Sequence, residues 1–136
     1  LTGKGLAAVA ESAVPSVSER ETAARIGHLT RNHQLVVSEY FHTDKAGHAQ
    51  DVQAARQCLL SIDRFLSGLV DTIDWSDTTF IMTSDHGNME DLSVKTHTRH
   101  PVPLIVAGQG AHHFDQVDDL VGVADAIIAA LRPASA

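Results

Sequence analysis

The stretch TTFIMTSDHGN, residues 78–88, joins a strand pattern to a polar loop that carries an acid and a histidine. Its first seven residues are rich in β-branched and apolar side chains, which predicts a strand over 78–84. An acid, a histidine and a glycine follow where that strand should end: Asp85, His86 and Gly87. Such a stretch is either a turn that happens to hold a histidine or part of a metal site.

The residues before this strand predict a βαβ unit. QLVVSEYF, residues 34–41, is a second apolar and β-branched run, which predicts a buried strand. A turn is expected over 42–48, followed by a long helix over 49–73 in which apolar residues recur every three or four positions. A strand–helix–strand order is typical of a right-handed crossover between parallel strands. We therefore expect an α/β fold with a mostly parallel sheet flanked by helices.

Further elements are expected at both ends of the chain. A third strand should cover 103–108, and a final amphipathic helix should cover 117–131. Toward the amino terminus, the spacing of apolar residues favours a helix over 3–12. A second helix should begin at Ser18, which forms the pattern of a capping box with Glu21.

Length, charge and cysteine usage restrict the class of protein. A chain of 136 residues without repeats or linkers is expected to form a single domain. The formal net charge of −7 argues against non-specific binding to nucleic acid or to anionic membranes. No apolar run approaches the roughly 20 residues needed to cross a bilayer. The lone cysteine, Cys58, fits a reducing cytosol, so a cytoplasmic location is expected.

Acids and histidines fall in three groups that suit metal binding. Asp44 and His48 stand four residues apart across the expected helix start, so they can point the same way. Asp85 and His86 follow a strand, and His97 lies in the loop beyond. A carboxylate with neutral imidazoles suits zinc, manganese or iron better than calcium or magnesium. Two carboxylates and three imidazoles exceed one four-coordinate ion and suit a two-metal site of the kind that serves phosphoryl transfer.

Each group alone also has a structural explanation. An Asp–His pair is more often a hydrogen-bonded turn than a pair of ligands, and Asp44 could be an acid at a helix start. His97 and His100 could be exposed loop residues. The metal site is favoured because all three groups fall on loops that one edge of the sheet should bring together.

The three motifs together resemble a known family. TDKAGH (43–48), TSDHGN (83–88) and HTRHPVP (97–103) occur in this order, separated by a long helix and a strand. This set resembles the alkaline phosphatase superfamily, and within it the branch of cofactor-independent phosphoglycerate mutases and metalloenzyme-domain proteins. The resemblance covers roughly residues 34–131. It implies two zinc or manganese ions and a covalent phosphoserine or phosphothreonine intermediate.

Carried over by position, the resemblance assigns a role to five residues. It implies one metal ion held by Asp44, His48 and His97. It implies a second ion held by Asp85 and His86. No catalytic nucleophile is assigned among the residues of this chain.

The resemblance also implies what this chain lacks. The family needs a further aspartate ligand and a serine or threonine nucleophile, both from the amino-terminal part of its fold. This chain has no aspartate before Asp44 and begins with Leu1, so we expect it to be the carboxy-terminal part of a larger metalloenzyme domain. His97 is preferred to His100 as a ligand because it aligns with the histidine of the family's H-T-x-x-P-V-P pattern.

Two functions remain open at this point. The first is the metal-binding portion of a two-metal phosphoryl-transfer enzyme, a phosphatase or phosphomutase, that acts on a phosphorylated small molecule and is inactive as this chain alone. The alternative is a non-catalytic metal-binding or assembly domain. Because an incomplete sheet would leave a strand edge unpaired, self-association is also expected.

Overall fold

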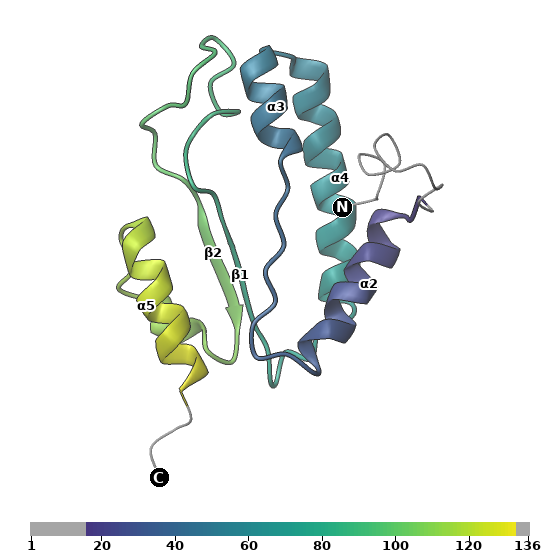
Figure 1. Ribbon diagram of the computed structural model, residues 1–136, viewed down its shortest axis with the longest axis vertical. Helices are drawn as coiled ribbons and strands as arrows, with labels where there is room; N and C mark the ends of the chain where they lie inside the picture. The colour runs from purple at the N-terminus through teal and green to yellow at the C-terminus, as the bar shows by residue number, and fades with distance from the viewer. Residues whose placement is uncertain (1–15, 133–136) are drawn as a thin grey trace, which may run out of the picture. The chain divides into compact units, whose positions relative to one another are not determined.

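The structure, a computed structural model, describes residues 16–132 (Figure 1). These residues form two compact units, and each is described by itself. The first unit comprises residues 16–73 with Asn88–Thr98, and the second comprises Asp74–Gly87 with residues 99–132. The helix expected over 3–12 lies outside the described residues. That the chain forms a single domain stays a prediction.

The first helix of the first unit confirms the expected capping box. Helix α2 spans Glu19–Thr30 and begins after the N-cap residue Ser18. The Ser18 hydroxyl accepts a hydrogen bond from the backbone N–H of Glu21, and the Glu21 carboxylate accepts one from the backbone N–H of Ser18 at 2.8 Å. The backbone N–H of Ser18, and its hydroxyl at 2.9 Å, both donate to the Glu21 carboxylate and hold the pKa of Glu21 below its usual value.

The long central helix is also confirmed. Helix α4 spans Val52–Val70, and the carboxylate of its N-cap residue Asp51 accepts a hydrogen bond from the Ala54 N–H at 3.0 Å. Helices α2 and α4 pack against each other (Figure 1). A Cβ atom added to Gly68 of α4 would lie 3.1 Å from the Ala23 side chain of α2, so the glycine allows a close approach of the two helices.

Polar contacts add to this helix pair. The Glu19 carboxylate accepts hydrogen bonds from the Ser61 hydroxyl at 2.9 Å and from Arg64 Nη2 at 3.1 Å. These partners, Arg64 above all, lower the pKa of Glu19 to about 2. A carboxyl with so low a pKa in the folded state makes stability depend on pH.

We expect Glu19→Gln to remove part of the acid sensitivity of the fold. Because the pKa of Glu19 is lower in the folded chain than its unfolded value of about 4.3, its stabilisation is complete above pH about 5 and is lost as the pH falls toward about 2. Screening by solvent limits the contribution to about 1 kcal/mol. Urea unfolding at pH about 7 should show the variant less stable, by a margin that narrows at pH about 3. An equal margin at both pH values would contradict the assignment.

The turn expected over 42–48 is wrong, since these residues belong to a helix. Helix α3 spans His42–Ala49 and ends at Gln50, whose φ of 54° lies in the left-handed region. Ala46 of α3 is buried against Ala55 and Cys58 of α4. A glycine and two histidines gave this stretch a weak intrinsic helix propensity, and packing against α4 overrides that weakness.

The buried strand expected over 34–41 is also wrong. This segment joins α2 to α3 without forming a strand, and no strand pairs with it among residues 16–132 (Figure 1). Val37 is 81% exposed and Phe41 is 60% exposed. An apolar, β-branched segment becomes a buried strand only where neighbouring strands accept its backbone hydrogen bonds and another layer covers its side chains.

The second unit contains both strands that the structure describes. Strand β1, Thr79–Thr83, and strand β2, Leu104–Gly108, confirm the strands expected over 78–84 and 103–108. They pair antiparallel, with Thr79 opposite Gly108. Helices and strands together agree with an α/β fold, but the sheet of the described residues is two-stranded and antiparallel. The residues between β1 and β2 include no crossover helix of the kind that parallel strands need.

Two helical segments complete the second unit. The short 3₁₀ helix η1 spans Ala111–Phe114. Helix α5 spans Leu120–Leu131 and confirms the helix expected over 117–131. Asp119 caps α5 by accepting a hydrogen bond from the Gly122 N–H at 2.8 Å. Across residues 16–132, no helix is both long and apolar enough to span a membrane.

Candidate metal centre

Helix α3 presents an acid and a histidine on one side. Asp44 and His48 lie one helical turn apart, and the Oδ1 atom of Asp44 is 3.3 Å from the Nε2 atom of His48. Asp44 stands in the first turn of the helix, where the helix dipole favours a negative charge. The expectation that these two side chains can point the same way is confirmed.

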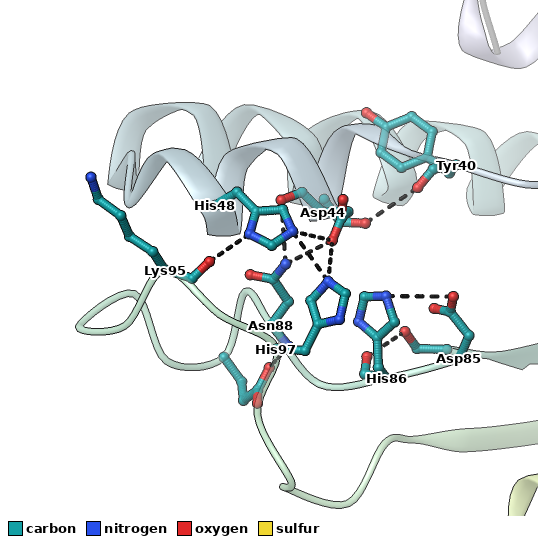
Figure 2. A network of polar contacts seen from close by, with 11 residues as sticks. Tyr40, Asp44, His48, Asp85, His86, Asn88, Lys95 and His97 are labelled. Carbon is teal, nitrogen blue, oxygen red and sulfur yellow. Dashed lines mark hydrogen bonds and ion pairs between the residues drawn. The ribbon is translucent and has the colours of Figure 1, made fainter.

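His97 joins this pair from the segment Asn88–Thr98 of the same unit. Its Nε2 atom lies 3.3 Å from Asp44 Oδ1 and 3.1 Å from His48 Nε2. Figure 2 shows both imidazole rings directed toward the Asp44 carboxylate. Three atoms that can donate an electron pair to a metal ion therefore form a nearly equilateral triangle.

The donor atoms fit a divalent metal ion. One carboxylate oxygen and two imidazole nitrogens are a ligand set typical of zinc and also suited to manganese. In a tetrahedral site with metal–ligand distances of about 2.0–2.1 Å, neighbouring ligand atoms are about 3.3–3.4 Å apart. The observed separations of 3.1 and 3.3 Å are close to this spacing.

A backbone carbonyl sets the tautomer of His48. The Nδ1 atom of His48 lies 2.5 Å from the carbonyl oxygen of Lys95 (Figure 2). Because a carbonyl oxygen only accepts hydrogen bonds, Nδ1 must carry the proton. In the neutral ring the lone pair is then on Nε2, the atom that faces Asp44. Ligating histidines commonly hold their other nitrogen in this way.

The segment that carries His97 is held at both ends. The Glu90 carboxylate accepts hydrogen bonds from the Asn88 backbone N–H at 2.6 Å and from the Thr98 hydroxyl. The Gln50 side-chain amide also donates to the Leu92 carbonyl at 3.0 Å, which attaches the segment to the end of α3. The segment is therefore held on both sides of His97.

The second predicted pair lies in the second unit, directly after β1. The Nε2 atom of His86 is 3.5 Å from Oδ2 of Asp85, and the Ser84 hydroxyl donates to the His86 carbonyl oxygen at 2.9 Å. The Asp85 side chain is 82% exposed. Asp85 is therefore open to solvent and to ligands.

Asn88 was not among the candidate site residues that the sequence indicated. Its side-chain amide donates a hydrogen bond to Asp44 Oδ1 at 2.7 Å. An amide nitrogen is not a metal ligand, so the search for acids and histidines passed over it. The available signal was its place in the motif TSDHGN, two residues after His86.

Comparison with known proteins agrees with the chemistry of this cluster. A family model described as the metalloenzyme superfamily matches residues 7–133. The chain is 32% identical over 83 residues to the 2,3-bisphosphoglycerate-independent phosphoglycerate mutase of Ehrlichia canis, covering 56% of this chain and 17% of that protein. It is 29% identical over 102 residues to the enzyme of the same name from Roseobacter denitrificans, covering 69% and 20%.

A third relative carries the same name. The chain is 28% identical over 95 residues to the 2,3-bisphosphoglycerate-independent phosphoglycerate mutase of Pyrococcus abyssi, covering 70% of this chain and 23% of that protein. It spans about a fifth of the length of these relatives. No solved structure matches it.

Proposed function

The chain belongs to the metalloenzyme superfamily, and we propose that it supplies part of the metal centre of a two-metal phosphoryl-transfer enzyme of the phosphatase or phosphomutase type. The observation that carries this proposal is the triangle formed by Asp44, His48 and His97. The relatives named as phosphoglycerate mutases support a phosphorylated small molecule as the substrate of the intact protein.

In this proposal each residue of the triangle has a defined task. Asp44 supplies a negative charge that compensates the cation, and both imidazoles present an Nε2 lone pair. The Lys95 carbonyl keeps the proton of His48 on Nδ1 and so keeps Nε2 available. All three ligand side chains are partly exposed, which leaves room for a phosphate group. A bound zinc or manganese ion would neutralise charge on the phosphoryl oxygens and lower the pKa of an attacking hydroxyl.

The proposal also includes a second metal ion and a lack of activity in this chain alone. Asp85 and His86 would hold the second ion, together with an aspartate from the rest of the enzyme. We expect little or no turnover by this chain alone, because the resemblance places the nucleophile outside its residues. A mostly parallel sheet in the larger domain, a cytoplasmic location and self-association of this chain stay predictions.

A non-catalytic metal-binding domain is the second candidate function. It is favoured by the fact that Asp44, His48 and His97 all belong to the first unit. One ion can therefore be held by residues of that unit alone, with Asp85 and His86 idle. Both candidate functions require an ion bound by Asp44, His48 and His97. They differ in whether that ion then binds a phosphate group.

Metal analysis of the purified chain tests the ligand assignment. After dialysis against zinc and removal of free metal, we expect about one tightly held ion per chain, because three ligands of one site are in place. His97→Ala should weaken zinc binding at least about tenfold, since it removes one imidazole of the triangle. Asp85→Ala should retain the ion and serves as the matched control. Loss of the ion in Asp85→Ala with retention in His97→Ala would contradict the assignment.

Inorganic phosphate then separates the two candidate functions. Part of a phosphoryl-transfer centre should bind phosphate in the zinc-loaded chain and not in the metal-free chain, which titration calorimetry can measure. A zinc-loaded chain that does not bind phosphate would favour the non-catalytic domain.

A further inference from the structure

We infer that Asn88 is a positioning residue, which holds the Asp44 carboxylate in place for metal binding, and that Gly47 is needed to admit it. The Nδ2 atom of Asn88 lies 2.7 Å from Asp44 Oδ1 and 3.4 Å from the Asp44 backbone oxygen (Figure 2). Asn88 is only 5% exposed, so its amide is held firmly. The inference rests on the proposed function, because it concerns the oxygen proposed to bind the ion.

The chemistry of an amide suits this task. Its nitrogen donates hydrogen bonds, accepts none, and carries no charge that would repel a cation. A carboxylate oxygen has two lone pairs, so Asp44 Oδ1 can accept from Asn88 and still offer a lone pair to a metal ion. Ligating carboxylates are commonly hydrogen-bonded by a second residue in this manner.

Gly47 makes this contact sterically possible. It lies on α3 between Asp44 and His48, and a Cβ atom added to it would lie 1.7 Å from Asn88 Oδ1 and 2.5 Å from Asn88 Cγ. The three atoms nearest to that added Cβ all belong to the Asn88 side chain. A side chain at position 47 would therefore push the amide away from Asp44.

The other end of the amide shows that packing alone does not explain Asn88. Its Oδ1 atom is buried and has no hydrogen-bond partner among residues 16–132. A buried acceptor without a partner destabilises the folded state. The backbone N–H of Asn88, which donates to Glu90, would make the same contact with another residue at this position. What distinguishes asparagine here is the donor that it directs to Asp44.

The test is a set of zinc affinities measured on the full 136-residue chain by competition with a chromogenic chelator. We expect Asn88→Ala and Gly47→Ala each to weaken zinc binding about 10–100-fold, the usual effect of losing a partner of a ligand. The double variant should bind zinc no more weakly than Asn88→Ala, because the added Cβ then meets no asparagine side chain. Should Gly47→Ala fold poorly, the same double variant should restore folding.

A second readout separates positioning from a structural role. The melting temperature of metal-free Asn88→Ala should stay within about 3 °C of the wild type, since loss of one hydrogen bond is offset by removal of the unpartnered oxygen. A residue that acts only through stability would lower the melting temperature and the zinc affinity together. Asn32→Ala, at an exposed asparagine, and Gly122→Ala, where the nearest atom to an added Cβ is 3.5 Å away, are matched controls.

The outcomes distinguish this inference from the proposed function. If His97→Ala loses zinc while Asn88→Ala binds it normally, the positioning role is wrong and the metal site stands. If the losses in Gly47→Ala and Asn88→Ala add in the double variant, Gly47 does not act through Asn88. If the wild-type chain binds no zinc, the metal site and the positioning role are both wrong.

Discussion

Asp44→Asn should weaken zinc binding more than about 100-fold, beyond the effect of losing an outer partner. The Oδ1 atom of Asp44 takes part in both 3.3 Å contacts of the donor triangle, so its charge serves the whole site. Asparagine keeps the shape of the side chain but leaves a divalent ion with two neutral imidazoles and no compensating charge. The fold should survive, because Asp44 is on the surface of its helix rather than in the core.

The zinc affinity is measured by the same chelator competition. The control is a variant that also loses one negative charge. Asp63→Asn replaces an exposed acid on α4 and should leave zinc affinity unchanged. Circular dichroism of metal-free Asp44→Asn should match that of the wild type. Zinc binding within about tenfold of the wild type would mean that other residues hold the ion.

Gly108→Ala should destabilise the second unit by about 2–4 kcal/mol, since it combines backbone strain with a steric clash. Gly108 has a φ of 102°, a conformation that side-chain-bearing residues rarely adopt. An added Cβ atom would lie 2.0 Å from the Thr78 carbonyl oxygen. The Thr78 carbonyl oxygen belongs to the backbone next to the Thr79–Gly108 pair. It can therefore move away only if the end of the two-stranded ladder is disrupted.

Urea unfolding followed by tryptophan fluorescence measures the stability of the second unit. The one tryptophan of the chain, Trp75, belongs to the second unit. Gly122→Ala is the matched control, since its Cβ atom would make only ordinary contacts, with Val117 and Asp119, and alanine favours a helix. A loss below about 0.5 kcal/mol for Gly108→Ala would show that the turn at this position has another backbone conformation.

Elements with a strong local pattern were predicted well from the sequence. Helix α4 has a sustained apolar periodicity and an aspartate cap, and α2 has its capping box at Ser18. Strands β1 and β2 are short runs of β-branched and apolar residues that end in polar or glycine-containing stretches. In each case the signal lies within a few residues of the element that it specifies.

The two wrong predictions concern adjacent segments whose structure depends on distant residues. The segment 34–41 has the composition of a strand but no ladder partner among the described residues. Residues 42–49 have a weak helix propensity, yet they form α3 because Ala46 packs into a core with Ala55 and Cys58. Composition alone could not decide either case, because the stabilising contacts come from elsewhere in the chain.

Patterns in the sequence were sufficient to identify helices α2, α4 and α5, the two strands, the family resemblance, and the spacing that lets Asp44 and His48 share one side of a turn. The resemblance grouped His97 with this pair, but the 3.1 Å approach of the two imidazole nitrogens across 49 residues of chain comes from the tertiary structure. The same holds for the hydrogen bond that Asn88 donates to the Asp44 carboxylate over Gly47. The difference lies in how far apart along the chain the interacting residues are. Periodicity and capping act between residues a few positions apart, whereas a ligand triangle and a missing Cβ atom depend on where separate segments pack in space.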